Sequence, residues 1–507
     1  MTESERQWNV ITSTRSSRRV ILAVAAAGLG AASGSAWAQP VLPQFAFPGE
    51  GVALQETPRF IGSGVELADV SGDGLLDIVV SDNFGQFSYT HEFNVLINNG
   101  DGTFAPAVSS SVETEGNEFS NLALALGDLN GDGRADLVTT RLSVFTPPDG
   151  NRPNIAVLFG QADGRFTGQA NLANSTTDRF MRRARGRNVA LGDMNGDGHL
   201  DIVSPASSSS FSVVPGNGDG TFGAPIQSGT GFSEITTLGD IDGDGDPDAI
   251  GVWNSGSDNR VEVTISVNRN DGDGSFTPAP SFTLDARLNA LITGQARAFL
   301  TDLTGDGLAD YLLFGERGSQ SGAGGLYVLR SDGDGTFTQI FRETRSQDGM
   351  NTGTIVVADF DGDGDVDIAK VPNVGEVGEI LVNDGAGGFA VTTPLQADLS
   401  YLVTAAAGNV VGSALPDIVL YDDPPESTPT RLRVMENLTP LAPPPCPADF
   451  DGSGSVSSAD ITSFLSAWFA DLTSGTLTAD FNQSGSTTSA DITAFLGAWF
   501  AAIADGC

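Results

Sequence analysis

Basic side chains are scarce in this sequence of 507 residues. Lysine and arginine together number 25, aspartate and glutamate number 64, and the formal net charge is −39. Lys370 is the only lysine. Proteins bind DNA and RNA through a basic surface that neutralises phosphates. The composition therefore argues against a nucleic acid as partner.

Histidines and the common catalytic motifs are also missing. His91 and His199 are the only histidines, and the sequence has no pair of zinc ligands at helical spacing and no serine nucleophile elbow. Paired carboxylates for glycoside hydrolysis stay open as an alternative, although most aspartates belong to the metal-binding pattern described below. We therefore identify no catalytic residues, and we favour a non-enzymatic role while the question of an enzyme stays open.

Long apolar segments are absent except near the N-terminus. There the pair Arg18-Arg19 precedes the apolar run 20–29, and Ala36-Trp37-Ala38 has the form of a signal-peptidase site. We expect residues 1–38 to be an export signal of the twin-arginine or the general secretory type, and the mature protein to be secreted or displayed at the cell surface. An uncleaved membrane anchor is the alternative, but the run is short for a span. We expect no membrane span in the mature chain.

Glycine, by contrast, is abundant, with 64 residues, and much of it lies in an acidic loop that recurs along the chain. In the loop 359–367, aspartates occupy positions 1, 3, 5 and 9, and glycines occupy positions 4 and 6. Like charges this close repel one another unless a cation lies between them. Calcium suits a flexible loop of oxygen ligands better than magnesium does. The predicted side-chain ligands of the six intact copies are Asp69, Ser71, Asp73 and Asp77; Asp128, Asn130, Asp132 and Asp136; Asp193, Asn195, Asp197 and Asp201; Asp240, Asp242, Asp244 and Asp248; Asp302, Thr304, Asp306 and Asp310; and Asp359, Asp361, Asp363 and Asp367.

The variation at these positions separates two interpretations. Asp-Gly pairs also form ordinary turns without an ion, but the six copies vary only among side chains that carry oxygen, which favours cation binding. A seventh copy at 409–417 has Asn409, Val411, Ser413 and Asp417 in the same positions. We expect this degraded copy to bind no metal.

The spacing of the copies predicts the fold. They begin between about 47 and 65 residues apart, a period typical of propellers and solenoids. In the third unit, strands are expected at 188–191, 200–204 and 211–215, followed by an Asn-Gly-Asp-Gly turn and a fourth strand that begins at 221–223. Four strands in each of seven units predict a mainly β fold, a seven-bladed β-propeller over residues 39–438.

The nine-residue acidic loop followed by the Asp-Gly-Thr-Phe turn resembles the FG-GAP or VCBS repeats of integrin-α-type propellers. The resemblance covers essentially all of residues 40–438. It implies a calcium-stabilised propeller used mostly for adhesion or recognition. We expect a strand from the segment near Phe45–Leu54 to help close the ring.

Ligand binding is expected on the face of the propeller opposite the acidic loops. In a four-stranded meander the acidic loops and the Asp-Gly-Thr-Phe turns lie on one face, and the longer, irregular connections lie on the other, where binding residues concentrate. The connection between the second and third units contains five candidate ligand-binding arginines: Arg179, Arg182, Arg183, Arg185 and Arg187. They could bind an acidic extracellular glycan or a protein that presents carboxylates. A solvated loop whose arginines pair with nearby acids is the alternative.

The chain changes character after a proline-rich linker at 439–445. Residues 446–507 contain two EF-hand-like loops that start 31 residues apart, and each loop runs into an amphipathic helix. We expect the Trp and Phe residues of these helices to pack against one another. The predicted calcium ligands are Asp449, Asp451, Ser453, Ser455 and Asp460 in the first loop, and Asp480, Asn482, Ser484, Ser486 and Asp491 in the second.

This duplicated pattern resembles a dockerin domain of the type that ends in Gly-Cys. The resemblance implies binding to a cohesin domain, which tethers the cargo to a scaffold or a cell surface. Ser453 and Ser484 replace the usual carboxylate at position 5, which predicts weaker calcium affinity than in the propeller. Small residues beside positions 10 and 11 of each loop are the expected partner contacts.

The two cysteines bracket this domain. Cys446 and Cys507 are expected to form a disulfide in an exported chain, with free thiols or intermolecular pairing as the alternatives. Closing a loop of about 60 residues would stabilise the domain by roughly 4 kcal/mol in the chain-entropy model.

The sequence thus favours a secreted, calcium-binding adhesion or recognition protein that is tethered through its C-terminal domain. A polysaccharide-active enzyme, a lyase or a glycoside hydrolase carried by the same dock, is the alternative. A purely structural surface-layer protein is the third possibility.

Overall fold

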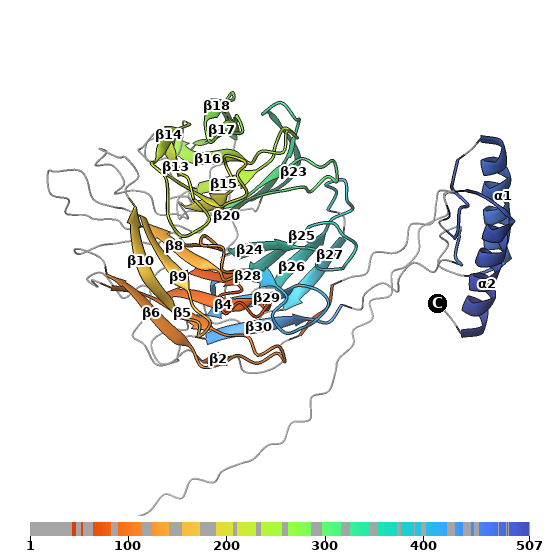
Figure 1. Cartoon of the computed structure of the whole chain (residues 1–507), viewed down its shortest axis with the longest axis horizontal. Coiled ribbons are helices and arrows are strands. Elements are labelled where there is room, and N and C mark those ends of the chain that lie inside the picture. Colours follow the sequence, from red (N-terminus) through yellow and green to blue (C-terminus); the bar gives the residue numbers. More distant parts are fainter. Residues whose placement is uncertain are drawn as a thin grey trace, which may run out of the picture. The chain divides into compact units, whose positions relative to one another are not determined.

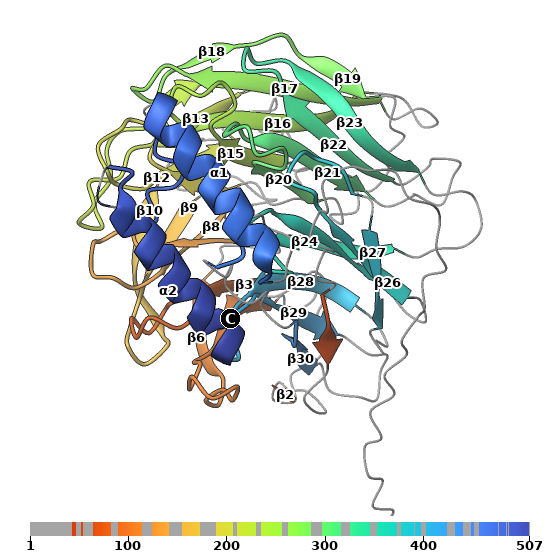
Figure 2. The same ribbon diagram turned by 90° about the vertical axis from the view of Figure 1, so that its right-hand side faces the viewer.

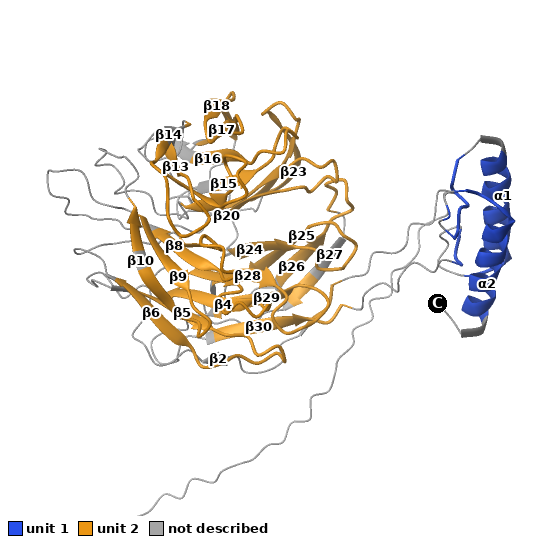
Figure 3. Cartoon of the chain, viewed as in Figure 1, with its two compact units in different colours: residues 1–39, 445–507 blue, residues 40–444 orange. Residues whose placement is uncertain are grey.

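The computed structural model of the protein describes residues 43–46, 52–53, 64–82, 90–113, 124–140, 155–172, 189–205, 210–229, 235–255, 262–284, 297–315, 325–344, 352–372, 377–389, 391–396, 402–422, 431–439, 448–450, 456–474, 476–482, 484 and 486–505. The chain divides into two compact units (Figure 3). One is Pro40–Pro444, which holds all the strands, and the other contains Pro445–Cys507, which holds both helices.

Within the described ranges, the strands of the first unit form seven antiparallel sheets that follow one another around a ring (Figure 1). We call these sheets blades 1 to 7. Each connects its strands in sequence order, as a meander does. Blade 1 consists of β3 (Gly64–Ala68), β4 (Asp77–Asp82), β5 (Thr90–Leu96) and β6 (Val108–Glu113); blade 2 of β7 (Leu124–Gly127), β8 (Asp136–Thr140), β9 (Ile155–Gly160) and β10 (Phe166–Leu172); and blade 3 of β11 (Ala190–Gly192), β12 (Asp201–Pro205), β13 (Phe211–Val214) and β14 (Ile226–Ser228).

Of the other four blades, blades 5 and 6 follow this plan, and blades 4 and 7 vary it at their outer edges. Blade 4 has a fifth strand, and blade 7 takes two short strands from the start of the unit. Blade 4 consists of β15 (Ile235–Gly239), β16 (Asp248–Ser255), β17 (Glu262–Asn270), β18 (Phe276–Pro278) and β19 (Phe282–Leu284); blade 5 of β20 (Arg297–Thr301), β21 (Asp310–Gly315), β22 (Gly325–Ser331) and β23 (Phe337–Thr344); blade 6 of β24 (Thr352–Ala358), β25 (Asp367–Pro372), β26 (Val377–Val382) and β27 (Val391–Gln396); and blade 7 of β28 (Leu402–Gly408), β29 (Asp417–Asp422), β30 (Arg431–Asn437), β1 (Phe45–Ala46) and β2 (Val52–Ala53).

The second strand of each blade is apolar on both of its faces, because each blade packs between two others. In β4, Ile78, Val79 and Val80 are consecutive and are at most 1% exposed. Strands that are buried on both faces show such continuous apolar runs instead of alternation. The sequence pattern after each acidic loop is thus explained by the stacking of blades.

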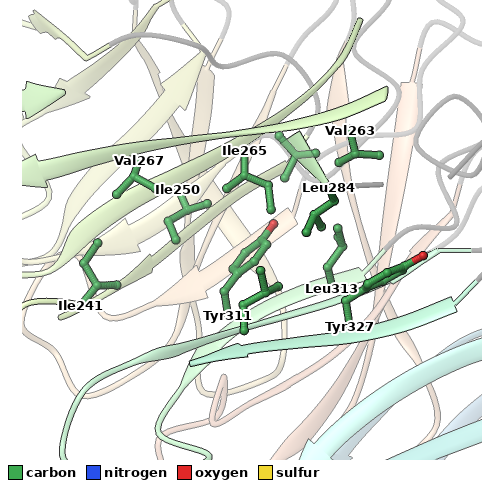
Figure 4. Packing of buried hydrophobic residues seen from close by; sticks show 11 residues of the cluster. Ile241, Ile250, Val263, Ile265, Val267, Leu284, Tyr311, Leu313 and Tyr327 are labelled. Carbon is green, nitrogen blue, oxygen red and sulfur yellow. The ribbon is translucent and has the colours of Figure 1, made fainter. Parts of the chain in front are cut away.

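The core of the propeller consists of seven clusters, one at each seam between successive blades. Figure 4 shows the seam between blades 4 and 5, where Tyr311 and Leu313 of β21 pack against Ile250 and Ile265. At the seam between the last blade and the first, Val80 packs in one cluster with Tyr421. The ring is therefore closed.

The N-terminal strands of the unit confirm the prediction for the segment near Phe45–Leu54. Both β1 and β2 pair with β30, through Phe45 with Asn437 and through Val52 with Leu432. Blade 7 therefore contains strands from both ends of the propeller sequence, and their pairing within this blade joins the two ends.

The predicted seven-bladed architecture is confirmed, but some strand boundaries were wrong. In blade 3 the fourth strand begins at Ile226 and not at Thr221. Phe222 instead makes an isolated bridge with Gly216, and Gly223 donates to the carbonyl of Pro215 at 2.7 Å. These contacts close the turn before the regular ladder resumes.

Lys370 lies in the seam between blades 5 and 6. Its ammonium group is 2.6 Å from a carboxylate oxygen of Glu343 and 2.6 Å from one of Glu379, and its side chain is 7% exposed. Lys370, on β25, therefore forms an ion pair across the seam with Glu343 of β23 and a second ion pair within its own blade with Glu379 of β26.

The C-terminal unit pairs two helices, α1 (Ser458–Ser474) and α2 (Ser489–Asp505), which lie side by side (Figure 2). Phe464 and Phe495 are fully buried and stack with ring centroids 4.3 Å apart. Phe450 and Phe481, which each precede a helix by a loop, pack edge-on against Phe495. The predicted packing of helix aromatics is correct for these rings.

The packing prediction was wrong for the outer part of the apolar pattern. Phe469 is 62% exposed, Leu472 54%, Phe500 63% and Ile503 54%. A helix turns by about 100° per residue, so Phe469 and Phe500 lie at the edge of the stripe that holds Phe464 and Phe495. Leu472 and Ile503 lie near the C-terminal ends of their helices.

Neither helix among the described residues combines the length and the hydrophobicity that a membrane span requires.

Candidate metal centres

The acidic loops lie at one end of the blades, and in blades 1 to 6 the Gly-Asp-Gly turns or their variants lie at the same end. Each acidic loop joins the first strand of its blade to the second, and each turn joins the third strand to the fourth. We number the loops 1 to 7 with their blades: 69–77, 128–136, 193–201, 240–248, 302–310, 359–367 and 409–417. All the predicted propeller ligands therefore lie on one face, which we call the loop face.

The position-1 aspartate folds each loop around its own carboxylate. In loop 6, Asp359 Oδ1 accepts from the backbone N–H of Gly362 at 2.6 Å, and Oδ2 accepts from that of Gly364 at 3.0 Å. Both glycines have positive φ values, 82° and 99°, which side chains with a Cβ rarely adopt. The same pair of hydrogen bonds recurs at Asp69, Asp128, Asp240 and Asp302.

Positions 1, 3 and 5 converge. In loop 6, one carboxylate oxygen from each of Asp359, Asp361 and Asp363 lies within 4.8 Å of the other two, and the same holds for the first three aspartates of loop 4. Position 5 is held by the loop itself, because Asp363 Oδ1 accepts from the N–H of Asp365 at 3.0 Å. The remaining intact loops have Ser71, Asn130, Asn195 and Thr304 at position 3.

In loop 4, the burial of an Asp242 oxygen bears on whether the acidic centre would suit a cation. Asp242 Oδ1 is buried and has no hydrogen-bond partner among the described residues. Its other oxygen lies 3.4 Å from Arg269 Nη1. Burial, together with the nearby charge of Asp244, raises the pKa of Asp242. A buried carboxylate oxygen without a donor is costly unless a cation satisfies it.

The chemistry of the donors fits calcium. Each intact loop offers oxygen from positions 1, 3 and 5 and a carbonyl at position 7, with position 9 close behind, and calcium takes six to eight oxygen ligands. No sulfur or imidazole group belongs to the set, because His199 occupies position 7 of loop 3, where the backbone carbonyl is the donor. The residues present would hold a hard divalent cation.

The position-9 aspartate has a second role that the sequence did not reveal. In all seven loops it is fully buried. One oxygen accepts from the N–H at position 2, and the other accepts from the N–H at the end of the third strand, at 2.7–3.0 Å. These residues are Asp77, Asp136, Asp201, Asp248, Asp310, Asp367 and Asp417. They tie the loop to the third strand of the same blade.

Loop 7 keeps this tie although it lacks the carboxylates at positions 1, 3 and 5. Asp417 keeps both hydrogen bonds, to Val410 N at 2.9 Å and to Asn437 N at 2.9 Å. Ser413 Oγ also donates to Asp417 Oδ1 at 3.1 Å, and Asn409 Oδ1 accepts from Gly412 N at 3.0 Å. Loop 7, which has no carboxylate at positions 1, 3 and 5, is thus closed by hydrogen bonds of Asn409, Ser413 and Asp417.

Burial raises the pKa of the position-9 aspartates in the intact loops. Desolvation is the largest cause, the backbone hydrogen bonds oppose it, and neighbouring carboxylates add to it. The pKa of Asp136 rises to about 6, and those of Asp248 and Asp367 rise to about 7. In loop 6, the pKa of Asp361 also rises to about 6 for the same first cause.

These shifts predict that the calcium-free protein becomes less stable as the pH rises from about 4 to 7. A carboxyl group whose pKa is higher in the folded chain binds more protons when folded, so the stability is present at low pH and is lost as the pH rises through the folded pKa. Thermal unfolding in EDTA should therefore show a higher Tm at pH 5 than at pH 7.5. With saturating calcium the order should reverse, because protons then compete with the cation.

The control for this pH effect is salt. Added NaCl screens the general repulsion of a protein with net charge −39 but acts little on buried groups. If high salt abolishes the difference between pH 5 and pH 7.5, the buried aspartates are not its cause.

The described part of the two C-terminal loops holds the same kinds of contacts. Asp460 Oδ2 accepts from Ser457 N at 2.7 Å, and Asp491 Oδ2 accepts from Thr488 N at 2.7 Å, so each caps the start of its helix. In the second loop, Ser484 N donates to Asp480 Oδ1 at 2.9 Å and to Asn482 Oδ1 at 3.0 Å. These contacts bring Asp480, Asn482 and Ser484 together. Ser486 is connected to this group by its backbone carbonyl, which accepts from Ser484 Oγ at 3.1 Å.

Several predicted residues lie outside the described residues. They are Asp451, Ser453 and Ser455 of the first C-terminal loop, the arginines Arg179, Arg182, Arg183, Arg185 and Arg187, the cysteines Cys446 and Cys507, and the export signal 1–38. Asp449, the first ligand of that loop, is described and has a partner.

Comparisons with known proteins agree with the fold of the first unit. A family model described as "FG-GAP-like repeat" matches residues 69–139, 193–251, 240–313 and 302–369, and the matches end before loop 7. Integrin alpha pat-2 of Caenorhabditis elegans is 26% identical over 234 residues, which are 39% of this chain and 18% of that protein. Its counterpart in Caenorhabditis briggsae is 28% identical over 233 residues, again 39% of this chain and 18% of that protein.

The chain thus carries FG-GAP-like repeats arranged as a seven-bladed β-propeller, and over this region it is similar to integrin alpha proteins. It spans about a fifth of the length of the curated relatives that it matches. Among solved structures, the exotype rhamnogalacturonan lyase YesX matches with a TM-score of 0.43 and 14% identity over 76% of this chain and 75% of that one. The V. cholerae biofilm matrix protein Bap1 matches with a TM-score of 0.34 and 11% identity over 79% of this chain and 92% of that one.

Proposed function

We propose that the protein is a secreted, calcium-binding adhesion or recognition propeller that is tethered to a cell surface or extracellular scaffold through a dockerin-like C-terminal unit. The convergence of three carboxylates in loops 4 and 6, with a buried Asp242 oxygen that lacks a donor, carries the calcium part of this proposal. The similarity to integrin alpha proteins supports a role in adhesion or recognition.

The ligand of the propeller is proposed to bind on the face opposite the loop face. On the loop face, polar groups of the loops and turns are already hydrogen-bonded to one another. For example, Asp77 accepts from the backbone N–H of Asn98. At the opposite end of each blade the second strand ends and the third strand begins, and the five arginines stand in the sequence between blades 2 and 3. An acidic extracellular glycan or a carboxylate-bearing protein surface fits those arginines.

The tethering part of the proposal draws on the pseudo-symmetry of the C-terminal unit. Trp468 Nε1 donates to the carbonyl of Thr488 at 2.8 Å, and Trp499 Nε1 donates to the carbonyl of Ser457 at 2.9 Å, so each repeat is pinned to the loop of the other. Phe469 and Phe500 pack edge-on against these tryptophans, with centroids 5.2 Å apart in both repeats. Each helix thus exposes large apolar side chains at corresponding positions, Phe469 and Leu472 on α1 and Phe500 and Ile503 on α2.

Metal analysis tests the calcium part. The purified mature protein, dialysed against micromolar calcium, should contain six ions in the propeller, and any ions of the C-terminal loops should be lost first on dilution because those loops have fewer carboxylates. A preparation without calcium, under conditions in which the protein is folded, would refute the proposal.

Binding to purified cohesin domains tests the tether. A chain that ends at residue 445 should not bind any cohesin that retains the full chain. The double variant Phe469→Ser/Phe500→Ser should weaken that binding, whereas the matched exposed control Thr462→Ala/Thr493→Ala should not. Equal retention of the full and the shortened chains would show that residues 446–507 are not the dock.

A further inference from the structure

In five of the seven blades, a polar residue at the end of the third strand links the loop of its own blade to the loop of the preceding blade. In blade 4 this residue is Asn270, which is 2% exposed. Its backbone N–H donates to Asp248 Oδ1, at position 9 of its own loop, at 2.7 Å. Its side-chain Nδ2 donates to the carbonyl of Pro247 at 3.2 Å and, across the seam, to the carbonyl of Met194 at 2.9 Å.

Met194 is position 2 of loop 3, and its own backbone N–H donates to Asp201 Oδ2 at 3.0 Å. An unbroken chain of hydrogen bonds thus runs from Asp248 through Asn270 and Met194 to Asp201. It joins the position-9 aspartates of two neighbouring loops, and all four residues are buried. Inside a protein such a chain is stronger than it would be in water, because the local dielectric constant is low.

The same connection recurs at four more seams. Asn98 donates to the carbonyl of Val410, Asn383 to that of Leu303 and Asn437 to that of Phe360, at 2.8–2.9 Å, and Ser331 Oγ donates to that of Ile241 at 2.6 Å. We name the set of Asn98, Asn270, Ser331, Asn383 and Asn437 the seam donors.

We propose that the seam donors make cation binding cooperative between successive loops, from blade 3 through blades 4, 5, 6 and 7 to blade 1. This inference rests on the proposed calcium function of the loops. A cation that orders loop 3 fixes the Met194 carbonyl, which fixes Asn270. Asn270 in turn holds the position-9 carboxylate of loop 4 in place, so loop 4 loses less conformational freedom when it binds its own cation.

Loop 7 belongs to this chain although we expect it to bind no cation. Val410 accepts from Asn98 of blade 1 and donates to Asp417, and Asp417 accepts from Asn437, which donates to Phe360 of loop 6. The degraded loop therefore transmits between loops 6 and 1, which gives a reason for Asp417 to stay when the acidic ligands were lost.

Two seams lack the connection and provide an internal control. Blades 2 and 3 have Gly160 and Gly216 where the other blades have a seam donor, and their backbone N–H groups bond only to Asp136 and Asp201 of their own loops. The seam between blades 2 and 3 is bridged instead by Gly220 N, which donates to the Leu129 carbonyl at 3.0 Å and is not bonded to a position-9 aspartate.

A thermodynamic cycle tests the proposal with calcium alone as the probe. Loop 3 is disabled by Asp193→Ala/Asp197→Ala, and the protection of the backbone amides of residues 240–248 against hydrogen exchange is followed as calcium is added. Disabling loop 3 should raise the calcium concentration at half-protection of loop 4 roughly 3- to 10-fold, the effect expected for one net hydrogen bond. In an Asn270→Ala background the shift should disappear, and Asn270→Ser, which copies blade 5, should restore it.

The control disables loop 2 by Asp128→Ala/Asp132→Ala and follows loop 3, across the seam that has no seam donor. We expect a shift below about 1.5-fold there, because the hydrogen bond from Gly220 that crosses this seam does not reach the position-9 aspartate of loop 3. Equal shifts at the two seams, or a shift at loop 4 that survives Asn270→Ala, would overturn the coupling while leaving calcium binding intact. Absence of any calcium-dependent protection in all loops would overturn the proposed function itself, and the coupling with it.

Discussion

Chelation of calcium should lower the melting temperature of the propeller more than any single substitution. A ligand that binds only the folded state at 100 times its Kd stabilises it by about 2.7 kcal/mol. Six such sites would together contribute roughly 16 kcal/mol, as much as the whole free energy of unfolding of a typical domain. The calcium-free chain should also suffer from the repulsion of its acidic loops, which the bound ions cancel.

Differential scanning calorimetry with and without EDTA measures this effect. Calcium added back should restore the melting curve, and magnesium at the same concentration should restore less, because it prefers a rigid octahedral site and keeps its waters. A melting curve that EDTA leaves unchanged would show that the loops are turns closed by hydrogen bonds in all seven blades, as loop 7 is.

Replacement of a position-9 aspartate should be the most damaging single change in the propeller. Asp417→Ala leaves two buried N–H groups, those of Val410 and Asn437, without an acceptor. Each such loss costs about 1–3 kcal/mol, so the free energy of unfolding should fall by roughly 2–6 kcal/mol. Urea denaturation with calcium present measures it.

Asp367→Ala is the matched variant in a loop that is expected to bind calcium. It should cause a similar loss in EDTA, a larger loss in calcium, and one ion fewer per molecule, whereas Asp417→Ala should leave the ion count unchanged. If Asp417→Ala proves neutral, the two backbone hydrogen bonds are not what fixes the seventh loop. If both variants lose an ion, loop 7 is a metal site after all.

Most of the propeller could be predicted because its signals are local and repeated. The closure of the loop at 359–367 could be predicted from its own residues. Glycine suits the positive φ values that bring two backbone N–H groups to Asp359 Oδ1 and Oδ2. Seven copies of one local unit then determine the blade count. The closing strand was predicted only as a segment near Phe45–Leu54, and its pairing with β30 is a contact between the two ends of the propeller sequence.

The features that escaped prediction depend on contacts between distant residues. Asn270 looks like an ordinary turn residue in the sequence, and only the seam shows that it reaches Met194, 76 residues away. The position-9 aspartates were read as ligands, and their ties to the third strand depend on how the blade folds back. A recurrent Asn or Ser just before the Gly-Asp-Gly turns was the available signal, and two glycines among the seven copies obscured it.

The outward-facing Phe469 and Phe500 show the limit of helical periodicity. The pattern places both residues near the apolar stripe, but the small core closes around Phe464, Phe495 and the two tryptophans. A unit with so few buried residues cannot cover every apolar side chain of its helices, and the pattern alone does not say which are left out.

The pairing of β1 and β2 with β30 has a consequence for how the protein is made. Residues 45–53 are among the first of the propeller to leave the ribosome, and their partners at 431–437 are among the last. The ring can therefore be sealed only after nearly the whole propeller sequence has been synthesised, and until then the final sheet has an open edge. A chain whose first residues are cut away after Ala53 would keep that edge permanently, ready to pair with a strand of another molecule.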